Sequence, residues 1–100
     1  MTVCSVLKSD NLYEVCIKGH SGYDTIGKDI VCSAVSSSFI LTVNLLDKLN
    51  SKMNLITDES IPMMKVTINN YTDIEETILD NLIDCLKDVS KQYPKYLKIK

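Results

Sequence analysis

The longest apolar segment, residues 28–50, constrains the fold of this chain more than any other feature. Its side chains recur at helical spacing in two adjacent, mainly apolar stripes. The first stripe consists of Val31, Val35, Ser38, Thr42, Leu45 and Leu49, and the second consists of Cys32, Ser36, Phe39, Val43 and Leu46. A helix that is apolar around so much of its circumference is covered on more than one side. Because 100 residues supply only one core, we predict that a second copy provides the other cover, in a homodimer.

The segments on either side of this helix have the alternating patterns of β-strands. Residues 2–7 and 12–18 predict a first hairpin, because turn-forming residues join them. Residues 53–57 and 63–69 predict a second hairpin, and residues 95–100 alternate as in a last strand. These strands leave one further segment to be assigned.

That segment has the start and stop signals of a second helix. Thr72 and Glu75 have the capping-box spacing, and Pro94 marks the end. Between them an apolar stripe recurs at helical spacing, formed by Ile74, Ile78, Leu82, Cys85, Val89 and Tyr93. The element order is therefore ββαββαβ. We predict a single domain, residues 1–100, folded as an α+β two-layer sandwich with two helices on one face of a mixed sheet.

The charge balance argues against several classes of partner. The chain has eleven lysines, no arginine, thirteen acidic residues and a net charge of −2, whereas nucleic-acid binders normally have a basic excess and guanidinium groups. We therefore expect no direct nucleic-acid partner. No apolar run of signal-peptide length lies in the first thirty residues, and we expect no membrane-spanning segment. A cytoplasmic protein that does not bind membranes is predicted.

The four cysteines are Cys4, Cys16, Cys32 and Cys85, enough for two disulfides. Without a secretory signal, reduced thiols are the favoured interpretation. There is no C-x-x-C pair, so we expect no metal site. For Cys4, Cys16 and Cys85 we expect the role of small buried hydrophobes.

Cys32 differs because of its surroundings in residues 19–36. It lies within about the first turn of the predicted helix, and the only histidine, His20, follows directly after a strand. Helix N-termini favour anions, which would favour a thiolate, and an imidazole can take the thiol proton and later protonate a leaving amine. Free N–H groups of the same turn can hold an oxyanion. The residues alone leave open whether His20 contacts Cys32.

Two more residues share the helix face of Cys32. Asp29, Cys32 and Ser36 are spaced i, i+3 and i+7. Asp29 either caps the helix or orients His20. Ser36 either donates a hydrogen bond to the site or is a small residue that allows close packing.

Gly19-His20, followed by Gly27-Lys28-Asp29-Ile30-Val31-Cys32 and Ser36, resembles the signature of the ribosomal-processing cysteine protease Prp family. Two serines, Ser21 and Ser33, stand where that family commonly has alanine. The resemblance implies a small homodimeric cysteine endopeptidase without metal or cofactor. It further implies cleavage of an N-terminal extension from a bacterial large-subunit ribosomal protein (number twenty-seven), after an aromatic pair.

Carried over by position, the resemblance implies that Cys32 is the nucleophile and His20 the general base and acid, with Asp29 and Ser36 in supporting roles. It implies that the loop from Ser21 to Lys28 covers the substrate. The loop residues expected to matter are Gly22 and Gly27 as hinges and Tyr23 and Ile26 as substrate contacts. Two alternatives remain, a non-catalytic ribosome-assembly binding module with the same fold and a purely structural small domain.

Overall fold

The computed structural model describes residues 1–19, 26–58 and 60–100. Seven elements follow one another along the chain, in the predicted order ββαββαβ. They are β1 (Thr2–Lys8), β2 (Leu12–Gly19), α1 (Ile26–Lys48), β3 (Asn54–Asp58), β4 (Met63–Asn69), α2 (Asp73–Gln92) and β5 (Leu97–Ile99).

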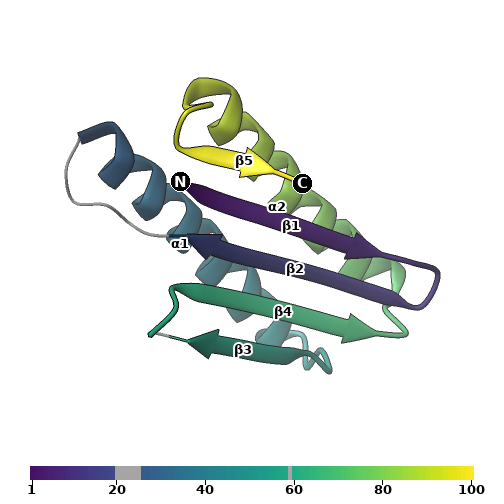
Figure 1. Cartoon of the computed structure of the whole chain (residues 1–100). Helices are drawn as coiled ribbons and strands as arrows, with labels where there is room; N and C mark the ends of the chain where they lie inside the picture. Colours follow the sequence, from purple (N-terminus) through teal and green to yellow (C-terminus); the bar gives the residue numbers. More distant parts are fainter. Residues whose placement is uncertain (20–25, 59) are drawn as a thin grey trace.

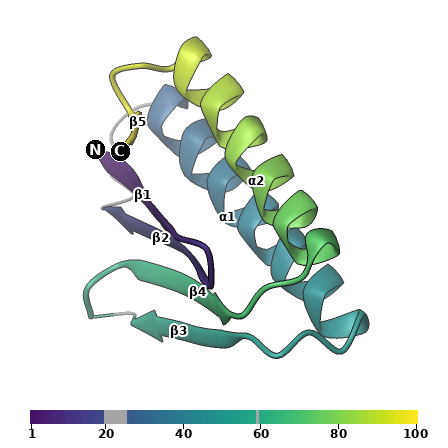
Figure 2. The ribbon, with the colours of Figure 1, turned by 90° about the vertical axis from the view of Figure 1, so that its right-hand side faces the viewer.

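The strands form one five-stranded sheet in the order β3-β4-β2-β1-β5 (Figure 1). β5 runs parallel to β1, and the other neighbours are antiparallel, so the sheet is mixed. Both helices lie on the same face of this sheet (Figure 2). The predicted two-layer α+β sandwich is therefore confirmed.

The core lies between the sheet and the two helices. Alternation along β2 turns Tyr13, Val15 and Ile17 into it. The helices contribute Val31, Val35, Phe39, Val43 and Leu46 from α1 and Leu79, Leu82, Ile83 and Leu86 from α2. Of the predicted apolar stripes, Leu45 and Leu49 remain exposed (45% and 52%), as does the neighbouring Leu41 (72%); Leu49 directly follows the last residue of α1. One side of α1 is thus covered by the sheet, and the other is uncovered in the single chain.

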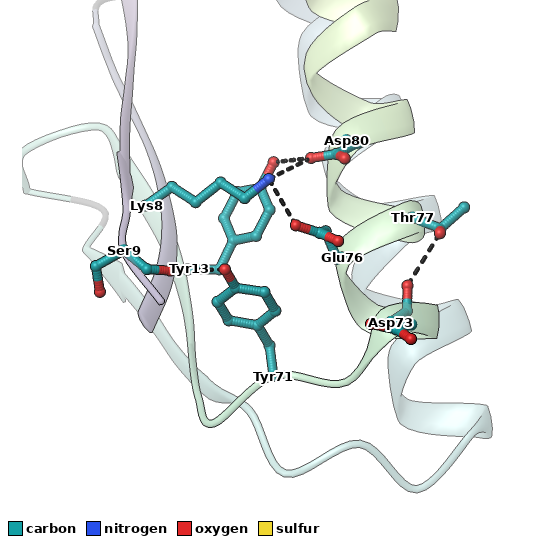
Figure 3. Close-up of polar contacts among 8 residues, drawn as sticks. All are labelled: Lys8, Ser9, Tyr13, Tyr71, Asp73, Glu76, Thr77 and Asp80. Carbon is teal, nitrogen blue, oxygen red and sulfur yellow. Dashed lines mark hydrogen bonds and ion pairs between the residues drawn. The ribbon is translucent and has the colours of Figure 1, made fainter. Parts of the chain in front are cut away.

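A polar cluster fixes the β1–β2 hairpin to α2 at the end of β2 opposite Gly19 (Figure 3). Lys8 Nζ lies 2.8 Å from a Glu76 carboxylate oxygen and 3.4 Å from one of Asp80. The buried Tyr13 hydroxyl donates a 2.6 Å hydrogen bond to Asp80, and burial raises the pKa of this tyrosine. The hairpin is therefore held against α2 by directional contacts as well as by apolar packing.

By length and mean hydropathy (1.6), the stretch Ile30–Lys48 of α1 could cross a membrane. The expectation of no membrane-spanning segment stays a prediction, because this likeness is one of length and composition only, with many aliphatic residues outweighing the interspersed serines. The buried α1 residues pack against the protein's own sheet, however, and core helices of soluble proteins have the same composition.

Candidate active site

Cys32 opens into a cavity of about 460 Å³ between α1 and the sheet. The residue is half-buried, and Ser36, one helical turn further along α1, lines the same cavity. Cys32 and Ser36, which share a helix face by their spacing, therefore line one cavity. Val35 closes the cavity between them from the core side.

Gly19 ends β2 at the wall of this cavity. Its φ of +149° is unusual for residues with a side chain, and an added Cβ would lie 2.5 Å from Thr2 Cα and 2.7 Å from the Met1 carbonyl oxygen. Its N–H donates a 3.1 Å hydrogen bond to the Pro62 carbonyl. Only glycine fits between these neighbours, so the strand end that precedes His20 is fixed beside the cavity.

His20 itself lies outside the described residues, and so do Gly22 and Tyr23 of the predicted substrate loop. What the structure shows is that Gly19, the residue before His20, and Cys32 line one cavity. The strand end and the helix, which are separated by a loop in the sequence, are thus brought together as the Cys–His hypothesis requires.

The helix begins earlier than predicted. Ile26 and Gly27, which we placed in the loop, belong to the first turn of α1. A glycine is tolerated there because the first N–H groups of a helix make no internal hydrogen bond, which reduces its propensity cost. The expected loop therefore ends before Ile26, and only the backbone of Ile26 and Gly27 is described.

This boundary moves two other residues deeper into the helix. Cys32 is the seventh residue of α1, in the second turn rather than the first, and Asp29 is the fourth. The interpretation of Asp29 as the N-cap is therefore wrong, because the N-cap precedes the first helical residue. Among the described residues, the N–H groups without a helical partner are those of Ile26, Gly27 and Lys28, so a helix-supplied oxyanion donor would lie about one turn before Cys32.

The end of the β3–β4 hairpin forms the wall opposite α1, and the sequence analysis did not identify it. The hairpin residues that line the cavity are Thr57, Asp58, Pro62, Met63 and Met64. Thr57 pairs with Met64 across the two strands, and Met64 pairs in turn with Ile17 of β2. No local signal marks these residues, because their position depends on β4 pairing with β2.

Among the described residues that line the cavity, Asp58 is the only charged one. Its carboxylate accepts hydrogen bonds from the Ser60 hydroxyl (2.7 Å) and N–H (2.9 Å) and from the Ile61 N–H (3.3 Å). These bonds, the one from the Ser60 hydroxyl above all, lower the pKa of Asp58. The carboxylate is thus engaged in holding the hairpin turn, and the remaining lining is largely apolar.

The other cysteines are separate from this cavity, and all four are free. Cys4 is fully buried as predicted, and burial, followed by the nearby Cys16 thiol, raises its pKa to about 11. Cys16 is half-buried, and Cys85 is exposed. The prediction that Cys85 is a buried hydrophobe is wrong, because its position lies at the edge of the helix pair, with its Sγ 3.5 Å from the Ser38 hydroxyl oxygen.

A free cysteine opens into a largely apolar cavity, beside the strand end that precedes the chain's only histidine. A thiol beside such a cavity is accessible to a bound peptide, as cysteine-based peptide chemistry requires. The family model described as cysteine protease Prp matches residues 1–98, and the chain belongs to this family.

Solved structures share the fold. The essential ribosomal processing protease Prp from S. aureus, in complex with a substrate peptide, has a TM-score of 0.88 and 17% identity; the match covers 100% of this chain and 98% of that one. The same protease with a covalently linked product peptide has a TM-score of 0.86 and 19% identity, with coverage of 100% and 98%. SMU.848 from Streptococcus mutans has a TM-score of 0.88 and 23% identity, with coverage of 100% and 92%. No curated protein sequence matches.

Proposed function

We propose that this protein is a cysteine endopeptidase that removes the N-terminal extension of a bacterial large-subunit ribosomal protein (number twenty-seven) in the cytoplasm. The observation that carries the proposal is that Cys32 and the end of β2 before His20 share one cavity. The family membership and the similar fold of a ribosomal processing protease bound to a substrate peptide support the same assignment.

In the proposed reaction, His20 takes the Cys32 thiol proton, and the sulfur attacks the carbonyl carbon of the scissile peptide bond. His20 then gives the proton to the leaving amine as the C–N bond breaks, which leaves a thioester on Cys32. His20 then takes a proton from a water molecule as the water oxygen attacks the carbonyl carbon of the thioester. The C–S bond breaks, the peptide leaves with a new carboxyl group, and His20 returns the proton to the Cys32 sulfur. No metal or cofactor takes part in this sequence.

The largely apolar lining supports an aromatic or aliphatic residue next to the scissile bond. Ile17, Val35, Met63 and Met64 supply side chains that such a residue would contact. Burial of apolar surface there would contribute about 25 cal/mol per Å², which favours large side chains over small ones. The cavity therefore suits cleavage after an aromatic residue.

We assign supporting roles to Ser36 and Asp29. Ser36 reaches the cavity one turn beyond Cys32, where its hydroxyl would donate a hydrogen bond to the bound peptide backbone. Asp29 shares the helix face of Cys32, and we propose that it orients His20. Gly22, Tyr23, Ile26 and Gly27 would form the segment that covers the peptide, with the last two provided by the first turn of α1.

We also propose that the protein is a homodimer. Exposed aliphatic side chains continue from the outer side of α1 to β3, which follows it in the chain and forms an edge of the sheet. They are Ile40, Leu41, Leu45, Leu49 and Leu55. Soluble monomers seldom expose many large apolar side chains in one region, so a second copy is the cover that we propose.

The decisive experiment follows cleavage of a peptide that carries the extension and its junction, with mass spectrometry to locate the cut. Cys32→Ala and, separately, His20→Ala should lower kcat/KM by about a thousandfold or more, since the nucleophile or its base is lost. Cys85→Ala removes an exposed thiol outside the cavity and should cleave like the wild type.

The alternative of a non-catalytic ribosome-assembly module makes the opposite prediction for this experiment. Such a module would bind the peptide without cutting it, and Cys32→Ala would bind as well as the wild type. Equal turnover by the wild type and Cys32→Ala would exclude the proposed mechanism.

A further inference from the structure

Positive charge is concentrated at the C-terminal end of the chain. Residues 87–100 contain five of the eleven lysines and only one acidic residue, Asp88, which gives this segment a net charge of +4. Residues 1–86 contain six lysines and twelve acidic residues and have a net charge of −6. The net charge of −2, from which we expected no nucleic-acid partner, averages two regions of opposite sign.

Three of these lysines converge on one open cleft, which we call the lysine cleft. Lys87 and Lys91 lie one turn apart on α2, and Lys98 comes from β5. Met1 lines the same cleft, and none of the described residues that line it is acidic. Figures 1 and 2 show why: the last turns of α2, β5 and the N-terminus lie at the same end of the molecule.

No carboxylate of the described residues forms an ion pair with these lysines, although Asp80 and Asp84 line a neighbouring pocket together with Lys87. Within the described ranges, both ion pairs of the protein are made by Lys8, at the β1–β2 hairpin. The dipole of α2 explains a cation such as Lys91 in its last turn, and protection of an edge strand explains Lys98. Neither effect explains why three cations share one cleft whose described lining contains no acidic residue.

We propose that the lysine cleft binds the phosphate backbone of RNA without sequence preference. The choice of RNA among polyanions rests on the proposed function, since a ribosomal protein substrate is found beside RNA. Lysine suits this role because its ammonium group acts as a point charge toward phosphate, whereas sequence readout favours the arginine fork, and the chain has no arginine.

The acidic remainder of the chain does not prevent such binding. The molecule is 40 Å long, whereas charges are screened over about 8 Å at physiological ionic strength. An RNA strand in the cleft therefore interacts mainly with the nearby lysines. Contacts of this number and kind give weak, salt-dependent binding, with Kd values of about 10⁻⁴ to 10⁻⁶ M.

The test measures binding of a short fluorescent single-stranded RNA by anisotropy across a salt series. The Cys32→Ala protein is used, so that the proposed peptidase activity plays no part in the measurement. The variant K87Q/K91Q/K98Q should weaken binding at least about tenfold and lower the slope of log K against log salt by about 2, since three phosphate contacts are lost. The matched control K48Q/K52Q/K65Q loses the same charge elsewhere and should keep most of the affinity and the slope.

Equal losses in the two triple variants would overturn the proposal, because net charge alone would then explain binding. Absence of binding by the parent protein at low salt would overturn it as well. If vesicles with anionic lipids bind through the same three lysines more tightly than RNA does, the cleft is a membrane site and the RNA assignment is wrong. Peptide cleavage is measured separately with a K87Q/K91Q/K98Q protein that retains Cys32. A failure of RNA binding can therefore be distinguished from a failure of the proposed peptidase function.

Discussion

The two helices cover the same face of the sheet but differ in how completely the single chain accommodates them. α2 begins with a capping box at Thr72, buries Leu79, Leu82, Ile83 and Leu86, and turns charged residues outward. α1 buries one side, whereas leucines remain exposed on the other, and its second turn carries Cys32 at the cavity. α2 is thus complete as a structural element, and α1 carries the features on which the proposed substrate site and the proposed dimer rest.

The largest expected effects on stability come from truncating a buried core side chain on each helix, and the two losses in free energy of unfolding should be similar. Phe39→Ala on α1 should lower the free energy of unfolding by about 3–5 kcal/mol, and Leu86→Ala on α2 by about 2–5 kcal/mol, because both side chains are fully buried. Urea denaturation monitored by circular dichroism measures both. A loss below about 1 kcal/mol for Phe39→Ala alone would show that α1 is loosely attached to the core.

The second prediction separates the helices by their outer faces. Leu41→Glu, at the most exposed α1 leucine, should shift the proposed dimer to a folded monomer, because a charge would be buried at the contact. Light scattering coupled to size exclusion measures the mass. The matched variant Thr77→Glu on the exposed side of α2 should leave the mass unchanged. A wild-type protein that is already monomeric at micromolar concentration would rule out the dimer.

The sequence predicted α2 better than α1 for a physical reason. Thr72, Glu75 and Pro94 are local signals, and the capping box forms as predicted, with Glu75 N–H donating to the Thr72 hydroxyl and Thr72 N–H donating to the Glu75 carboxylate. At α1 the glycine at position 27 suggested a loop, but the first helical turn tolerates it. Local signals therefore predicted the start of α2 closely, whereas the predicted start of α1 was two residues too late.

The cavity was only partly predictable. Cys32 and Ser36 share a face by helical spacing, which a sequence shows directly. The wall from Thr57 to Met64 depends on the strand order β3-β4-β2, a long-range pairing without a local signature. The requirement for Gly19 arises similarly, from the close approach of the chain at Met1 and Thr2.

The smallest effect concerns the capping box that distinguishes the start of α2. Thr72→Ala should lower the free energy of unfolding by about 1 kcal/mol, because the Glu75 N–H loses its acceptor. Desolvation alone would raise the pKa of Glu75, but hydrogen bonds from Ser51 and Thr72 outweigh it and lower the pKa overall. Glu75 therefore contributes stability above its unfolded pKa of about 4.3, and this contribution is lost as pH falls through the lower folded pKa.

That pH dependence is measured by urea denaturation between neutral pH and about pH 3, with Glu75→Gln as the control that does not titrate. The free energy of unfolding of the wild type should exceed that of Glu75→Gln at neutral pH, and this difference should disappear as the carboxylate is protonated. An advantage that is independent of pH would show that the charge of Glu75 plays no part in the cap.

The central claim is that Cys32 is a nucleophile at a peptide-binding cavity, and site-resolved alkylation tests it most directly. Iodoacetamide modification of the four cysteines is followed by mass spectrometry, with and without a peptide that carries the extension. The account predicts that Cys32 reacts faster than the more exposed Cys85 and that the peptide slows modification of Cys32 alone. If Cys32 reacts no faster than Cys85 and the peptide protects neither, the account is contradicted.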